Sequence, residues 1–89
     1  MNEELYELLE TEFLKYRIDE EVEDVLLTLA ESLADTAKIG QETSYSEQIG
    51  SARLIVYGTL EEFEDEEPAV FIRSLKINDS EYEINDYLL

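Results

Sequence analysis

The stretch EEFEDEEP, residues 61–68, holds six carboxylates around a single phenylalanine, Phe63. No Lys or Arg falls between Arg53 and Arg73. A second acidic segment, DEEVED, covers residues 19–24. Clustered carboxylates can bind metal ions, transfer protons or present negative charge to a cationic partner. These three kinds of chemistry make different demands on spacing, and the sequence separates them.

Metal binding is the first of these. An EF-hand loop places Asp or Asn at alternate positions before a glycine and adds a Glu further on. Segment 61–68 has no glycine and a different spacing, and segment 19–24 lies at a predicted helix start, where it cannot wrap an ion alone. The chain has no Cys and no His, so thiolate and imidazole ligands are missing. We expect weak, non-specific association of Ca²⁺ or Mg²⁺, with no dedicated metal site and no cofactor.

Catalysis by carboxylates is the second. A glycosidase pair needs a defined separation beside a substrate cleft. A chain of 89 residues has little room for such a cleft. The absence of His also removes the commonest general base. We therefore expect no catalytic residues and no enzyme activity.

The charge balance favours the third kind of chemistry. Acids outnumber bases by 24 to 6, which gives a formal net charge of −18. A net charge of about 2 to 8 keeps a small domain soluble, so solubility does not account for this excess. Helices usually alternate Glu with Lys four residues apart, whereas here Glu3 stands four residues before Glu7. Glu20 and Asp24 repeat this like-charge spacing. We infer that a cationic partner supplies the missing positive charge.

The elements that must position these acids follow from the hydrophobic periodicity. Apolar residues at spacings of three and four predict helices over about residues 2–16 and 20–38. The short connection between them predicts an antiparallel helical hairpin. Asp19 is the expected N-cap of the second helix, and Gly40 is expected just beyond its end.

In the second half of the chain, the spacing of the apolar residues changes from that of a helix to that of a strand. Residues 40–50 are polar between two glycines and are expected to form a mobile loop. Alternating β-branched and aromatic residues then predict strands over about 51–59, 69–77 and 80–86. A tight turn at residues 78–79 would place Leu75 opposite Tyr82. Segment 61–68 falls between the first two strands.

The sequence thus predicts one α+β domain, an N-terminal antiparallel helical hairpin packed on a C-terminal three-stranded antiparallel β-meander, ααβββ. A hydrophobic content of 44% argues for a folded core. No apolar run approaches the roughly 18 residues of a membrane span, and the N-terminus is acidic, unlike that of a signal peptide. We expect a soluble, cytoplasmic protein. Exposed edges of such a sheet also allow a homodimer.

In size, composition and charge, the chain resembles the small acidic DNA-mimic proteins of phages and mobile elements. That class includes anti-restriction proteins, uracil-DNA glycosylase inhibitors, anti-CRISPR proteins and inhibitors of nucleoid proteins. The resemblance rests on composition, so no residue role carries over from it. It implies that carboxylates stand in for DNA phosphates and sequester a basic nucleic-acid-binding protein or nuclease in the host cytoplasm. The chain itself would bind neither nucleic acid nor a membrane.

Three groups of acids are the candidate partner-binding residues. They are Glu61, Glu62, Glu64, Asp65, Glu66 and Glu67 in the first group, Asp19, Glu20, Glu21, Glu23 and Asp24 in the second, and Glu3, Glu7 and Glu10 in the third. Phe63, inside the first group, either anchors its loop by burial or contacts the partner as an exposed aromatic.

Other interpretations of the same acids stay open. An immunity or antitoxin-type protein would use them against a basic nuclease toxin. A small acidic interaction module would bind a basic protein without mimicry. A solvated surface that only keeps sheet edges from pairing needs no partner at all. Halophilic adaptation also raises the acid content, but a halophile needs molar salt to fold, whereas a mimic folds in dilute buffer.

Overall fold

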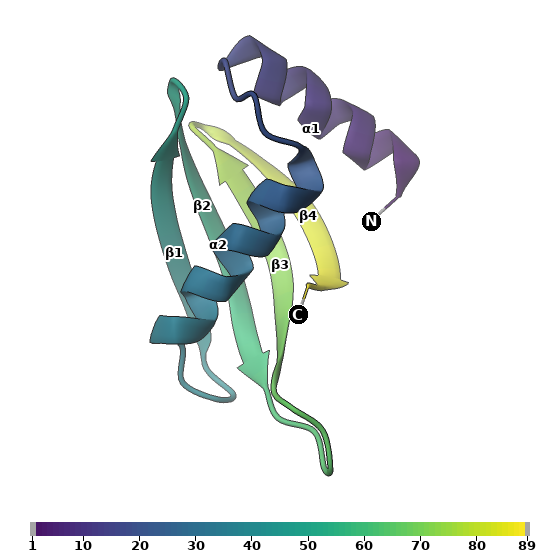
Figure 1. Ribbon diagram of the computed structural model, residues 1–89, viewed down its shortest axis with the longest axis vertical. Helices are drawn as coiled ribbons and strands as arrows, with labels where there is room; N and C mark the ends of the chain where they lie inside the picture. The colour runs from purple at the N-terminus through teal and green to yellow at the C-terminus, as the bar shows by residue number, and fades with distance from the viewer. Residues whose placement is uncertain (1, 89) are drawn as a thin grey trace.

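The computed structural model describes residues 2–88 (Figure 1). Within this described range lie two helices and then four strands, α1 (Glu3–Lys15), α2 (Val22–Thr36), β1 (Glu42–Ile49), β2 (Ala52–Glu61), β3 (Ala69–Ile77) and β4 (Ser80–Tyr87). The strands pair in chain order as one antiparallel sheet. The predicted α+β class and the meander are confirmed, but the sheet has four strands rather than three.

The additional strand is β1, so the mobile loop expected over residues 40–50 is wrong. β1 pairs with β2 along its whole length, and its residues alternate between exposed and half-buried. The half-buried positions include the polar Thr43 and Glu47 beside Tyr45 and Ile49. The Tyr45 hydroxyl donates to Glu47 Oε1 at 3.2 Å, which satisfies part of this polar content. Because an edge strand buries so little, its composition resembles that of a loop.

Helix α2 lies across one face of the sheet (Figure 1). Its buried stripe, spaced by three and four, is Val22, Val25, Leu26, Leu29, Ala30 and Leu33. The helix starts at Val22, with Glu21 as an N-cap that makes no side-chain capping bond, so the expected cap at Asp19 is wrong. It ends at Thr36, and Gly40 instead donates its N–H to the Leu60 carbonyl at 2.9 Å.

Helix α1 begins at the N-cap Asn2, whose Oδ1 accepts the Leu5 N–H at 2.8 Å. It buries Leu9 and Phe13. The predicted antiparallel hairpin is not formed, because the two helices do not run side by side. Instead α1 crosses over the start of α2 (Figure 1), so that Tyr6 of α1 lies near Glu23 and Leu26 of α2. While α2 runs down the sheet face, α1 lies at one end of the molecule beside β4.

The connection between the helices is held by the turn between β1 and β2. The N–H and the hydroxyl of Ser51 both donate to the Tyr16 carbonyl, at 2.9 and 3.0 Å. Gly50 has a φ of 59°, and a Cβ at this position would lie 2.5 Å from the same carbonyl oxygen. Only glycine combines that conformation with so close an approach. This turn therefore fixes where α1 lies.

A β-bulge sets which face the β3 side chains occupy. Leu75 pairs with Tyr82, as the turn at residues 78–79 predicts. Strict alternation along β3 would nevertheless place Val70 and Leu75 on opposite faces. The register shifts around Arg73, and Val70 and Leu75 are both fully buried. The shift keeps apolar residues under α2 on both sides of the bulge and leaves Arg73 exposed.

Candidate functional site

The first group of acids, Glu61, Glu62, Glu64, Asp65, Glu66 and Glu67, is here called the tip patch. Figure 1 shows that the loop between β2 and β3 is the end of the molecule farthest from α1. Residues 62–67 are all exposed. The loop turns at Asp65, which has a φ of 65°, and the Glu66 N–H donates to the Phe63 carbonyl at 3.3 Å. The tip patch is thus a protruding turn that carries like charges.

Glu61 differs from the rest of the tip patch because it ends β2 and is half-buried. A hydrogen bond between the Glu61 carboxylate and the Tyr87 hydroxyl, with burial, raises the pKa of Tyr87 above its usual range. The Oε2 atom of Glu61 is shielded from solvent, and no residue in the described range 2–88 hydrogen-bonds to it. Glu61 is therefore less available to a partner than residues 62–67.

Phe63 anchors the tip loop, although not in the core beneath α2. Its ring meets Tyr87 edge-to-face at 6.0 Å between centroids, and Tyr87 meets Phe71 in the same manner at 5.0 Å. Phe63 remains 40% exposed. The ring thus holds the loop against β3 and β4 while part of it stays open to a partner.

The second group, Asp19, Glu20, Glu21, Glu23 and Asp24, is here called the junction patch. All five residues are exposed, in the connection between the helices and the first turn of α2. The positive end of the helix dipole stabilises Glu23 and Asp24 in that turn. The helix start therefore tolerates this density of negative charge.

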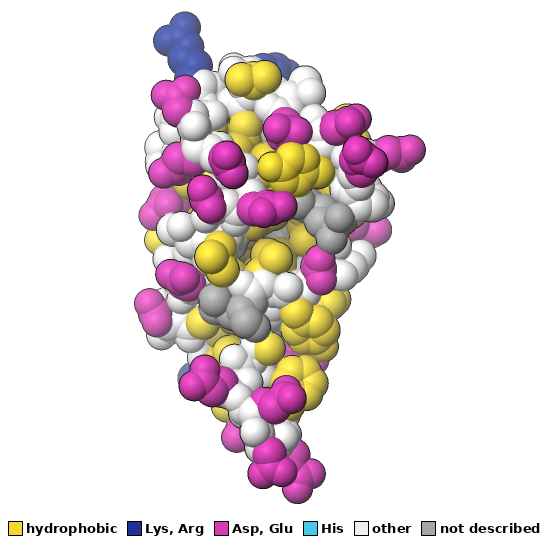
Figure 2. All heavy atoms as spheres, turned by 45° about the vertical axis from the view of Figure 1, so that its right-hand side comes forward, with side chains coloured by type: hydrophobic (Ala, Val, Ile, Leu, Met, Phe, Trp, Pro, Cys, Tyr) yellow, Lys and Arg dark blue, Asp and Glu magenta, His cyan; other side chains and the backbone are white. Residues whose placement is uncertain are grey.

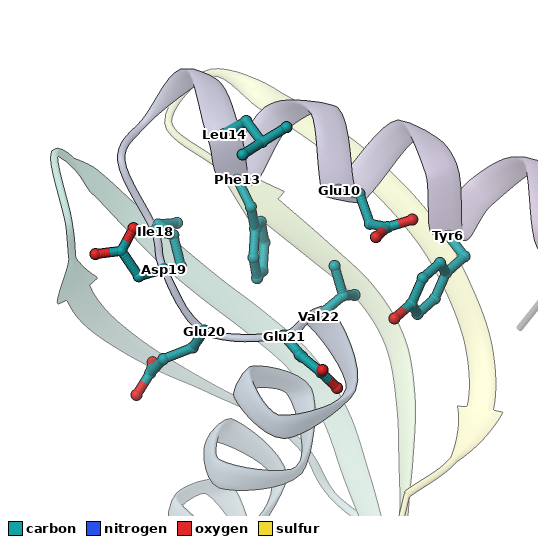
Figure 3. A pocket seen from close by; sticks show the side chains of 9 residues that line it. All are labelled: Tyr6, Glu10, Phe13, Leu14, Ile18, Asp19, Glu20, Glu21 and Val22. Atoms are coloured by element: carbon teal, nitrogen blue, oxygen red, sulfur yellow. The ribbon is translucent and has the colours of Figure 1, made fainter.

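Tyr6 is the point at which α1 meets the junction patch. In Figure 3, Tyr6 and Glu10 point from α1 toward the segment that contains Glu21. Burial raises the pKa of Tyr6 above its ordinary value, and the negative charges of Glu10, Glu23, Glu21 and Asp24 raise it further. Carboxylates from two separate elements thus act on one phenol.

The α1 acids of the third group do not act together. Glu10 joins the junction patch around Tyr6. Glu7 instead lines a shallow depression with Leu8 and Thr11 on another side of α1. Glu3 is exposed in the first turn of the helix.

Two hollows beside Tyr6, together called the Tyr6 groove, interrupt the acidic surface. The hollow shown in Figure 3 has a volume of about 290 Å³ and is lined by Tyr6, Glu10, Phe13, Leu14, Ile18, Asp19, Glu20, Glu21 and Val22. The other has a volume of about 300 Å³ and is lined by Tyr6, Glu23, Leu26, Leu27, Ile84, Asp86 and Leu88. Apolar side chains therefore form the floor and carboxylates form much of the rim.

Seen from the side that carries α1 and β4, acidic side chains extend from one end of the molecule to the other (Figure 2). Hydrophobic side chains lie between them in the middle of this face, and Lys and Arg appear at its margins. The longest dimension of the molecule is 41 Å. Arg73 pairs with Glu42 at 2.8 Å, so this base neutralises an acid outside the three groups.

Within residues 2–88, no three acidic side chains gather closely enough to hold a metal ion. None of the helices in the described part of the chain is long and apolar enough to cross a membrane. Comparisons with protein-family models, with curated proteins and with solved structures gave no match. The acidic face and the Tyr6 groove are therefore the features of the molecule that bear on its function.

Sequence reasoning missed the groove. Tyr6 lies off the apolar stripe of α1, and the expected hairpin would have carried it toward the far end of α2. The pattern of apolar residues does not reveal that α1 crosses over the start of α2. The available signal in the sequence was Leu14, an apolar residue beside the stripe of the first helix, and the structure leaves it 80% exposed.

Proposed function

We propose that the chain is a non-catalytic acidic inhibitor whose carboxylates replace DNA phosphates and sequester a DNA-binding protein or nuclease of a host or defence system. The observation that carries the proposal is the acidic face of Figure 2, which runs between the two ends of the molecule. The 41 Å length of the molecule corresponds to about twelve phosphates of one DNA strand at about 3.4 Å each.

The placement of the acids on short, well-anchored segments supports this proposal. The junction patch lies where hydrogen bonds from Ser51 hold the helix connection. The tip patch lies in a loop held by the Phe63 ring. Fixed charges need less ordering when a partner binds, so more of the interaction energy remains as affinity.

The shape of the surface supports binding rather than catalysis. The two hollows of the Tyr6 groove, at about 290 and 300 Å³, are at or just below the lower end of the size range of small-molecule sites. The tip patch is a protrusion, and none of its residues lines the two hollows of the Tyr6 groove or the depression beside Leu8. A protruding acidic surface suits a partner with a concave, cationic DNA-binding site.

The proposal is tested by immobilising the chain, passing a bacterial lysate over it in dilute buffer, and eluting first with duplex DNA and then with salt. Proteins that use their DNA-binding surface should leave the resin with the duplex DNA. If the retained proteins resist DNA and elute only with salt, the chain is an acidic interaction module without mimicry.

The matched variants for this test have equal net charge. One neutralises the tip patch as Glu64→Gln, Asp65→Asn and Glu66→Gln, and Asn tolerates the positive φ of residue 65. The control neutralises Glu31, Asp35 and Glu83, which are exposed and lie outside the three groups. The tip variant should retain less of the DNA-eluted protein than the control. Equal retention would mean that total charge matters and its placement does not.

A further inference from the structure

We propose that the Tyr6 groove binds a cationic amphipathic segment of the partner protein, with apolar side chains on the floor and Lys or Arg at the rim. This inference rests on the proposed function, because the segment belongs to the same basic partner. It adds a site that selects among basic proteins by shape and apolar contact.

The floor of the groove is apolar, so an occupant must place apolar side chains against it. Phe13, Ile18 and Val22 are buried beneath it, and Leu14 and Leu27 stand at its margins, 80% and 41% exposed. Leucines this exposed leave apolar area in water that a partner can cover. Purely charged occupants, such as a lysine-only chain, would leave that area uncovered.

The rim of the groove is acidic, so an occupant must place positive charge against it. Glu10, Glu21 and Glu23 act electrostatically on Tyr6 at its centre. No Lys or Arg is found among the described residues that line either hollow. An occupant therefore has to bring its own cations, and the Tyr6 ring offers a face for a cation–π contact.

These two demands decide between the occupants. A second copy of the chain would bring another net charge of −18 against the rim. Nucleic acid and anionic membranes are repelled for the same reason. A basic amphipathic protein segment meets both demands, because its apolar side chains cover the floor while its Lys and Arg reach the carboxylates of the rim.

The test uses a synthetic helical peptide of Leu and Lys, compared with a Lys-only peptide of equal charge. Calorimetry measures the affinity of each, and NMR locates each on the full chain. The Leu–Lys peptide should bind about tenfold more tightly and shift the backbone amides of Tyr6, Phe13, Val22 and Leu27. Equal affinity for the two peptides, or shifts confined to the tip patch, would overturn the proposal.

A pair of variants separates the groove from general attraction. Leu14→Ser with Leu27→Ser removes the apolar margins and should weaken Leu–Lys binding about tenfold while Lys-only binding is unchanged. Leu8→Ser is the control, since Leu8 is 55% exposed on the same helix but lines a different depression. If the double variant binds the Leu–Lys peptide as tightly as the control does, the groove is not the site.

The two proposals fail separately. No DNA is present in the peptide assay, so groove binding there together with DNA-resistant proteins in the lysate assay would refute mimicry alone. DNA-eluted proteins together with equal affinity for both peptides would refute the groove alone. Circular dichroism of the serine variants verifies that they are folded.

Discussion

Leu29 and Leu27 stand two positions apart on α2 but in different surroundings. Leu29 is fully buried against the sheet, whereas Leu27 is 41% exposed at the groove margin. Leu29→Ala should lower the free energy of unfolding by about 2–5 kcal/mol, because it leaves a cavity in a closely packed core. Leu27→Ala should cost less than about 1 kcal/mol. Urea unfolding measures both, and equal losses would contradict the assigned orientation of α2.

The raised pKa of Tyr6 predicts how the free energy of unfolding changes at alkaline pH. Burial, together with the negative charges of nearby carboxylates, raises its pKa above the ordinary value of 10.0. In the unfolded chain Tyr6 ionises at that ordinary value, so the stability from this group is complete below it. As pH rises through the folded pKa, unfolding releases a proton and this contribution is lost.

Tyr6→Phe removes this linkage. The stability of the variant relative to the native chain should therefore increase as pH rises past 10.0, as measured by urea unfolding at several pH values. Molar salt should reduce the difference, since it screens the carboxylates. A difference in stability that stays constant with pH would show that neither burial nor the carboxylates raise the pKa of Tyr6 in the folded chain.

At the residue scale, the apolar residues spaced by three and four that predicted the second helix do form the buried side of α2, because a period near 3.6 identifies the buried side of a helix. Tyr6 and Phe63 were less predictable. Phe63 rests on Tyr87, which ends the last strand, and Tyr6 lies by the start of another helix. Such contacts depend on how elements are oriented, and local spacing does not record orientation.

At the scale of the elements, we predict that a substitution in the turn between β1 and β2 displaces α1. Gly50 and Gly40 both have positive φ, at 59° and 81°. A Cβ on Gly50 would lie 2.5 Å from the Tyr16 carbonyl oxygen, while a Cβ on Gly40 meets nothing within 4 Å. Both alanine variants carry a backbone cost of about 1–2 kcal/mol, and Gly50→Ala adds the clash.

Thermal unfolding of the two glycine variants tests that prediction. Gly50→Ala should be the less stable, and its NMR spectrum should show α1 signals displaced while the sheet signals remain. If the two variants unfold at the same temperature, the turn does not hold the helix connection.

The strands show where sequence reasoning succeeds. β3 was predicted at residues 69–77 and is observed there, because it is rich in β-branched and aromatic residues and is bounded by Pro68 and the turn at residues 78–79. β1 was missed because an edge strand with polar half-buried positions lacks that signal. The predicted hairpin was wrong because Ser51 hydrogen-bonds to Tyr16, 35 residues away, and holds the end of α1 at the β1–β2 turn, a contact that local spacing does not record.

Considered as a whole molecule, a chain with a net charge of −18 should fold in dilute buffer and gain stability from salt. Raising the ionic strength from about 0.01 to 0.15 M shortens the Debye length from about 30 to 8 Å. Screened repulsion worth roughly 1 kcal/mol would raise the midpoint of thermal unfolding by about 4–8 °C. Circular dichroism follows the transition. A chain that stays unfolded until molar salt is added would favour halophilic adaptation.

The central claim is that the acidic face occupies the site where a partner holds DNA. Fluorescence anisotropy of a labelled duplex, bound to a purified protein retained in the lysate assay, tests this directly. Titrated with the chain, the duplex should be released. The Glu64→Gln, Asp65→Asn, Glu66→Gln variant should need about tenfold more protein, and its competition should depend less on salt. A duplex that stays bound while the chain also binds would contradict the account.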